Sequence, residues 1–425
     1  MRRGIAAAVV VSALTISASA CSSGTSDSGS DSSGPVTITW WDTSDATNEA
    51  GTFKSLIKDF EKANADVKVK YVNVPFGDAQ TKFQTAAGSK GAPDVLRADV
   101  GWTPGFAKAG YLAPLDGTPA AAESDKFEPN LIEQATYEDK LYGIPQVTDT
   151  LGLMYNKSLF AKAGITEAPA TWDELKADMA KVKEKAGADG FAFNPQGYYA
   201  MPFLFGEGTD MVEVGSKKIT LNSPAAVKGI DTLKGVLAAP GARKLDTTSN
   251  AYANIMDAFN NGKVAAIIQG PWENANVFKG SAFKDKANLG IAPVPKGSAG
   301  QGAPLGGHNL VAYAGSDAAH QKASQKFIAF MTSAASQGKT ALANGTLPTR
   351  SDAYTADVVK NPGIAGYQKL LPAGVARQPL PEYSSLYTPL ETQLIKIISG
   401  QEGTKSGLNK AATEAKRLLP TYSTS

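Results

Sequence analysis

The spacing of apolar residues after position 34 predicts alternating strands and helices. Residues 36–41 alternate apolar and polar side chains as a strand does, and Phe53, Leu56, Ile57 and Phe60 then fall on one face of a helix. The same reading predicts strands at 67–71 and 95–96 and helices at 79–87 and 104–109. This order is typical of a parallel sheet with crossover helices, in which ligands bind beyond the carboxyl ends of the strands.

Residues 141–157 carry the most informative change of pattern. Two apolar runs predict strands on either side of the polar segment Thr148, Asp149 and Thr150. A carboxylate between two core-forming elements must find hydrogen-bonding partners. Asp149 is therefore either a structural residue or a group placed to meet a polar ligand, and this stretch alone favours the structural role.

The second half of the chain continues the alternation. Thr171 and Glu174 have the spacing of a capping box and predict a helix with Leu175, Met179 and Val182 on one face. A short strand at 191–193 and an aromatic-rich turn at 194–199 follow. Further helices are predicted at 225–237, 252–259, 324–331 and 387–398, and a strand at 262–269 runs into Trp272.

Length and charge narrow the function. A chain of 425 residues is too long for one ordinary core, so two lobes are expected. There are 42 basic and 40 acidic residues, and removing Arg2 and Arg3 with a leader peptide leaves 40 of each. A neutral protein without a basic patch argues against binding to nucleic acid or anionic lipid and favours a neutral ligand.

The first residues predict export and anchoring. Residues 1–20 have a basic start, an apolar run and small residues before Cys21, as a signal peptide does. Cys21 is the only cysteine, and residues 18–21 are similar to a bacterial lipobox, in which that cysteine is lipidated. Residues 22–34 are nearly all Ser, Gly, Asp and Thr and predict a flexible tether with a reach of roughly 20 Å.

Residues suited to catalysis are scarce. His308 and His320 are the only histidines, and neither His-Glu-x-x-His nor Gly-x-Ser-x-Gly occurs. Gly338, Lys339 and Thr340 end like a phosphate loop, but Ser333 stands where the first glycine is required. We predict no catalytic residue, metal or cofactor; a glycoside hydrolase with paired carboxylates remains the alternative, since their spacing in the fold decides.

Aromatic and carboxylate side chains recur at the predicted strand ends and turns. Flat rings cover the C–H faces of a pyranose, and carboxylates accept hydrogen bonds from its hydroxyls. Each residue alone has a simpler explanation, since a lone tryptophan is usually core packing and an aspartate after a strand often caps a helix. Their recurrence predicts a ligand-binding set: Asp42, Asp45, Asp99, Trp102, Asp149, Tyr198, Trp272 and Tyr387.

Five motifs are spread along the chain. They are Trp40-Trp41, Gly91-Ala-Pro-Asp-Val95 before Trp102, Tyr142-Gly-Ile-Pro145 running to Met154-Tyr-Asn-Lys157, Phe259-Asn-Asn-Gly-Lys-Val264 leading to Gly270-Pro-Trp272, and Leu347-Pro-Thr-Arg350. They span nearly the whole chain after Gly34. Together they resemble one family, the extracellular solute-binding proteins of ABC sugar importers, and are most similar to actinobacterial maltose or maltodextrin-binding lipoproteins.

The resemblance implies an α/β, two-lobed periplasmic-binding-protein-like fold of type II, with a ligand cleft between lobes joined by a hinge that the chain crosses more than once. By analogy, 35–145 and about 308–350 form the N-terminal lobe, and 146–307 and about 351–425 form the C-terminal lobe. The crossings are expected near Pro145-Gln146, near Gly306–His308 and after Arg350.

The resemblance also implies roles for single residues. Trp272 is similar to the family's sugar-stacking tryptophan, Tyr198 to an aromatic residue of the same lobe, and Asp149 lies near the family's acidic contact. Tyr387 falls where maltose binders often have tryptophan. Gly101 and Trp102 replace an acidic and basic pair, so Asp99 is expected to take over the hydrogen bonding there.

The implied function is a monomeric binder of maltose or maltodextrins that delivers its ligand to an ABC permease. It would be held through Cys21 at the outer face of the cytoplasmic membrane. Another di- or oligosaccharide, such as trehalose or a cello-oligosaccharide, is the alternative ligand.

Overall fold

The computed structural model describes residues 34–425, so the predicted signal peptide, Cys21 and nearly all of the tether lie outside the described residues. The first of the two main sheets has the order β14-β13-β3-β1-β2, with β6 also paired to β13. Its strands are β1 (Val36–Asp42), β2 (Val67–Asn73), β3 (Val95–Asp99), β6 (Ile144–Thr150), β13 (Ala303–Ala312) and β14 (Gly374–Val375).

The strands predicted first along the chain do form a parallel unit. β1 pairs in parallel with β2 and β3, which places Asp42 and Asp99 at the carboxyl ends of neighbouring strands. Trp40 of β1 is fully buried and packs edge-on against Phe53 and Phe327, at ring separations of 5.7 Å and 5.2 Å. The helices that accompany these strands along the chain are α1 (Ala50–Ala63), α2 (Phe76–Gly88), α3 (Thr103–Lys108), α4 (Pro129–Gln134), α11 (Ala318–Met331) and α12 (Ala334–Asn344).

The second sheet has the order β12-β7-β11-β8. Its strands are β7 (Gly152–Asn156), β8 (Asp189–Ala192), β11 (Val264–Gln269) and β12 (Leu289–Ala292). Its helices are α5 (Lys157–Lys162), α6 (Trp172–Ala186), α7 (Gly197–Gly206), α8 (Pro224–Ala238), α9 (Ala251–Asn260), α10 (Asn274–Val277), α13 (Ala356–Val359), α14 (Pro362–Gln368), α15 (Tyr387–Ile398) and α16 (Thr404–Leu418).

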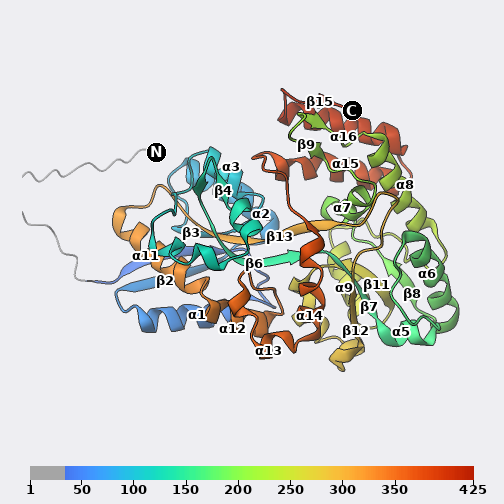
Figure 1. Ribbon diagram of the computed structural model, residues 1–425, viewed down its shortest axis with the longest axis horizontal. Coiled ribbons are helices and arrows are strands. Elements are labelled where there is room, and N and C mark those ends of the chain that lie inside the picture. Colours follow the sequence, from blue (N-terminus) through green and yellow to red (C-terminus); the bar gives the residue numbers. More distant parts are fainter. Residues whose placement is uncertain (1–33) are drawn as a thin grey trace, which may run out of the picture. The chain divides into compact units, whose positions relative to one another are not determined.

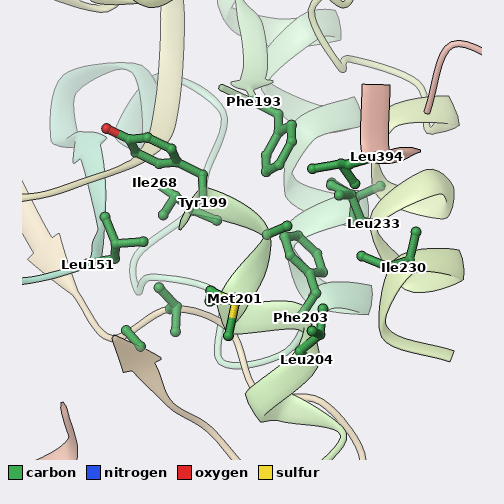
Figure 2. Close-up of a cluster of buried hydrophobic side chains, with 14 of the residues drawn as sticks. Leu151, Phe193, Tyr199, Met201, Phe203, Leu204, Ile230, Leu233, Ile268 and Leu394 are labelled. Atoms are coloured by element: carbon green, nitrogen blue, oxygen red, sulfur yellow. The ribbon is translucent and has the colours of Figure 1, made fainter. Parts of the chain in front are cut away.

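The C-terminal helices belong to the core of this second lobe. Figure 2 shows Phe203 of α7, Ile230 and Leu233 of α8 and Leu394 of α15 gathered in one buried cluster. In Figure 1, α15 and α16, at the red end of the chain, lie beside α7 and α8. The predicted capping box is confirmed, because the Thr171 hydroxyl accepts a hydrogen bond from the Glu174 amide at 3.1 Å.

Two long strands carry the chain between the sheets. β6 and β13 pair antiparallel from Ile144 opposite Leu310 to Thr150 opposite Leu305, and β7 begins only two residues after β6 ends. Figure 1 shows both strands lying between the two sheets, and they run in opposite directions. Gly307 has φ of +132°, and a Cβ there would collide with the Val147 carbonyl, so only glycine fits at this crossing.

Two local predictions were wrong. Asp149 lies inside β6 and not in a loop between strands, because its neighbours pair with β13 without a break. Tyr198 lies in the first turn of α7 and not in an irregular turn, because the helix begins at Gly197. Among residues 34–425, we find no helix with the length and apolar character of a membrane span.

The remaining strands form small separate ladders. These are β4 (Thr136–Tyr137) with β5 (Lys140–Leu141), and β10 (Lys218–Ile219) between β9 (Val212–Glu213) and β15 (Ser423–Thr424).

Candidate functional site

An ion pair joins the two lobes at the carboxyl end of β3. Asp99, the last residue of β3, accepts hydrogen bonds from both terminal nitrogens of Arg377, with Nη2 and Oδ2 at 3.2 Å. Arg377 follows β14 and precedes Leu380 and Tyr383, which pack in the core of the second lobe. Both charged side chains are about nine-tenths buried. Because a bidentate pair fixes both partners, Arg377 holds the Asp99 carboxylate in one orientation.

The backbone next to Asp99 is shaped for this pair. The Gly101 amide donates to Asp99 Oδ1 at 2.8 Å. A Cβ at Gly101 would collide with Arg377 Nη1 and with the Ser384 hydroxyl, so glycine is required for the two lobes to approach here.

Asp149 lies buried beside this pair and has spare hydrogen-bonding capacity. Its Oδ1 accepts one bond, from the Tyr198 hydroxyl at 3.3 Å. Gly306 lies opposite Asp149 on β13, and a Cβ there would collide with the carboxylate. Burial raises the pKa of Asp149 to about 7, an effect that Arg377 opposes and Asp99 reinforces. A carboxylate with one partner can still accept several hydroxyl donors.

Three half-buried aromatic rings lie near one another, and the hydroxyl of one of them, Tyr198, contacts Asp149. The Tyr198 ring lies 6.5 Å from Trp272 and 6.1 Å from Tyr387, tilted to both by 51° and 57°. The Arg377 guanidinium lies 5.7 Å from the Tyr198 ring centre. Asp99, Asp149, Tyr198, Trp272 and Tyr387 are therefore brought into one cluster, although they come from different elements.

Trp272 is held by a chain of hydrogen bonds. It lies in the short 3₁₀ helix Pro271–Glu273 directly after β11. Its Nε1 donates to the Tyr252 hydroxyl at 2.9 Å, and Tyr252 donates to Glu273 Oε1 at 2.6 Å. The ring edge is thus clamped, so ordering the ring costs little when a ligand binds.

Asp42 and Asp45 are engaged in local structure. Asp42 is fully buried and accepts bonds from the Ser44 amide at 3.0 Å, the Ser44 hydroxyl and the Tyr71 hydroxyl at 2.7 Å. Asp45 is exposed and accepts from the amides of Thr47 and Asn48 at 2.8 Å and 2.7 Å. This geometry gives both carboxylates a part in the turn before α1, and their contact with a ligand stays a prediction.

Trp102 lies in the first lobe and is covered by Phe76. The two rings stack at 5.0 Å with an angle of 26°, and Trp102 is only 6% exposed. Asp99 is the predicted site residue nearest to Trp102 in the sequence, three residues before it.

Several buried polar atoms around this cluster lack a hydrogen-bond partner among residues 34–425. They are Arg377 Nε, the hydroxyls of Ser384 and Tyr387, and both ring nitrogens of His308. Buried polar groups are usually paired, so these atoms are available to water or to a polar ligand.

Residues 45–338, more than half of the chain, match the model of a family described as bacterial extracellular solute-binding protein. The chain belongs to this family. The resemblance drawn from the motifs is therefore confirmed.

Solved and curated relatives of this solute-binding protein include binding proteins for several oligosaccharides. The GacH receptor of Streptomyces glaucescens, solved unliganded and with acarbose and an acarbose homolog, is 40% identical, with a TM-score of 0.87 over 91% of this chain and 99% of that chain. The diacetylchitobiose binding protein DasA of Streptomyces coelicolor is 28% identical over 86% of both chains. The maltodextrin-binding protein MdxE of Bacillus subtilis is 27% identical over 87% of this chain and 88% of its own.

These likenesses confirm the two-lobed α/β fold of type II. The curated relatives are named as binding proteins and not as enzymes, which at family level supports a non-enzymatic role.

The sequence motifs of this solute-binding protein do not indicate Arg377, Phe76 or His308 as site residues. Arg377 follows a segment without a regular apolar period, 278 residues after Asp99, so no local pattern indicates their contact. His308 was named as one of two histidines and at an expected crossing, without a role in binding. His308 lies opposite Asp99 because β13 pairs with β3. Only knowledge of that strand pairing would have placed His308 at the site.

Proposed function

We propose that this protein is the substrate-binding component of an ABC importer and captures oligosaccharides of the maltose and maltodextrin type between its lobes. The observation that carries the proposal is the cluster of Asp149, the Asp99–Arg377 pair and three half-buried rings, with buried polar atoms left unpaired around it. The rings offer faces to the C–H surfaces of sugar units, and Asp149 accepts hydroxyl hydrogens.

The ligand would also stabilise one arrangement of the two lobes. We propose the lobe division 35–145 with about 308–350 against 146–307 with about 351–425, and β6 and β13 as the connecting strands. Since Asp99 belongs to the first lobe and the aromatic rings to the second, a sugar touching both would favour the closed state. The closed form would then be the one that a membrane permease recognises.

The names of the relatives support the sugar class more than the exact sugar. GacH was solved with acarbose, MdxE is named for maltodextrin and DasA for diacetylchitobiose. MdxE and DasA have nearly the same sequence identity to this chain, although their names point to different sugars. The alternative ligand is therefore another oligosaccharide, such as one of the trehalose or cellobiose type.

A glycoside hydrolase is the second candidate, and the state of Asp99 argues against it. A hydrolase of this kind needs one carboxylic acid that can donate a proton and one free carboxylate. Asp99 is instead held in a bidentate pair with Arg377, which occupies both of its oxygens.

Titration of the purified protein tests the proposal. We expect saturable binding of maltose or maltotriose in a calorimeter, and weaker or no binding of trehalose, cellobiose, diacetylchitobiose and glucose. Chromatography of the sugar after long incubation should return it intact. Release of glucose or maltose that follows the pure protein would support the hydrolase, and tighter binding of another sugar in the panel would reassign the ligand.

We also propose that Cys21 anchors the protein to the outer face of the cytoplasmic membrane. Replacing Cys21 with serine removes the thiol that carries the lipid, so the protein should appear in the medium or remain as uncleaved precursor. Fractionation and the mass of the N-terminal peptide measure this, with Ser22→Ala as the control. A mature, membrane-bound Cys21→Ser protein would contradict the anchor.

A further inference from the structure

Phe76 is an unusual surface residue. Among the large apolar side chains of residues 34–425 that are well exposed, it is the one aromatic ring, with 48% of its surface accessible; the others are Leu342, Val359 and Leu418. It is the first residue of α2, after Pro75. Single exposed apolar side chains are common on protein surfaces, so Phe76 marks a contact surface only because other groups converge on it.

The ring is held from behind. Trp102 stacks under Phe76 at 5.0 Å, Phe106 lies 6.2 Å from Trp102, and Phe83 lies 4.8 Å from Phe106. Trp102, Phe106 and Phe83 are buried, so one face of Phe76 rests on a packed aromatic column of the first lobe. A platform fixed in this way loses little conformational freedom when a ligand covers it.

An uncharged histidine with free hydrogen-bonding atoms borders the ring. The His308 imidazole meets Phe76 edge to face at 5.8 Å and 74°. Burial, together with Arg97 and Arg377, holds the pKa of His308 well below its ordinary value. Neither ring nitrogen has a partner among residues 34–425. A neutral imidazole can donate one hydrogen bond and accept another, which suits a pair of hydroxyls.

This pair of residues adjoins the cluster already described. His308 of β13 is the direct partner of Asp99 of β3, and Asp99 is bonded to Arg377. From these contacts we propose that Phe76 and His308 form a second sugar-ring position on the first lobe, with Phe76 as the stacking surface and His308 as the hydrogen-bonding group. The inference rests on the proposed function and extends it: this position takes a sugar unit other than the one at Trp272.

A second position makes affinity depend on the number of sugar units. A ligand that reaches both Trp272 and Phe76 gains two stacking contacts, whereas a shorter ligand gains one. The variants that separate these contacts are Phe76→Leu, which keeps an apolar cover on Trp102 but no flat ring, and Phe76→Tyr, which keeps the ring. Leu342→Ala removes another exposed apolar side chain and is the control.

The experiment titrates these proteins with glucose, maltose, maltotriose and maltotetraose in a calorimeter, after thermal melts have shown that each variant folds. We expect Phe76→Leu to weaken binding of the longest sugars by roughly 5- to 30-fold and to reduce the gain in affinity with chain length. Phe76→Tyr and Leu342→Ala should bind as the wild type does. His308→Phe, which removes both ring nitrogens, should weaken binding of the same long sugars.

The possible failures are distinct. If the wild-type protein binds none of these sugars, the proposed ligand class is wrong and the second position falls with it. If the wild type binds and Phe76→Leu has unchanged affinity at every chain length, the proposed function stands and the second position is refuted. An equal loss for glucose and for the longest sugar would also refute it, because Phe76 would then belong to a single shared position.

Discussion

Trp272→Ala should lower the affinity for the bound sugar by roughly 2 to 4 kcal/mol, the range for a central aromatic anchor. The ring is half-buried, and its Nε1 is clamped by the Tyr252 hydroxyl at 2.9 Å, which in turn donates to Glu273. Removing the ring takes away a preformed stacking surface that the ligand does not have to order. Calorimetric titration with the preferred sugar measures the loss.

Trp272→Phe is the matched variant for this test. It keeps a flat ring but loses the hydrogen bond to Tyr252, so most of the affinity should remain. Thermal melts without sugar provide the other control, since Trp272 also packs against the core of the second lobe. If Trp272→Ala lowers the melting temperature and leaves affinity unchanged, Trp272 is a core residue and the ligand lies elsewhere.

Local patterns in the sequence were sufficient for most of the fold. The apolar spacing of 53–60 predicted α1, and the alternation of 36–41 predicted β1, because both elements bury one face against the same core. The spacing of Thr171 and Glu174 predicted the start of α6, since a capping box depends only on neighbours along the chain. These features depend on residues within a few positions of one another.

The parts of the site that depend on contacts between distant strands were not predictable. The polar neighbours Thr148 and Thr150 predicted a break between two strands at Asp149, but pairing with β13 keeps all three within one strand that is buried along its whole length. Arg377 meets Asp99 only because β14 pairs with the start of β13, and β13 further along pairs with β3. No periodicity encodes such a contact.

Sugar affinity should rise with pH up to about 7 and level off above it. Burial raises the pKa of Asp149 to about 7 in the unliganded protein, with Arg377 opposing the shift and Asp99 and the Tyr198 hydroxyl nearby. Hydroxyl groups that donate to Asp149 stabilise its charged form, so the bound state should have a lower pKa than the free state. Binding then releases a proton below pH 7, and affinity falls by at most about tenfold for each pH unit below that value.

The stability of the unliganded protein should fall as pH rises, whereas sugar affinity rises. This opposite direction makes the test specific for Asp149. A pKa of about 7 exceeds the ordinary value of about 3.9, so the folded state binds more protons between these values. The free energy of unfolding contributed by Asp149 is therefore lost as pH rises from about 4 to about 7.

Asp149→Asn keeps the shape without the titration, and its affinity should not change with pH. Calorimetry between pH 5 and pH 8 in buffers of different ionisation enthalpy measures both affinity and proton release; equal pH profiles for the wild type and Asp149→Asn would show that Asp149 does not contact the sugar.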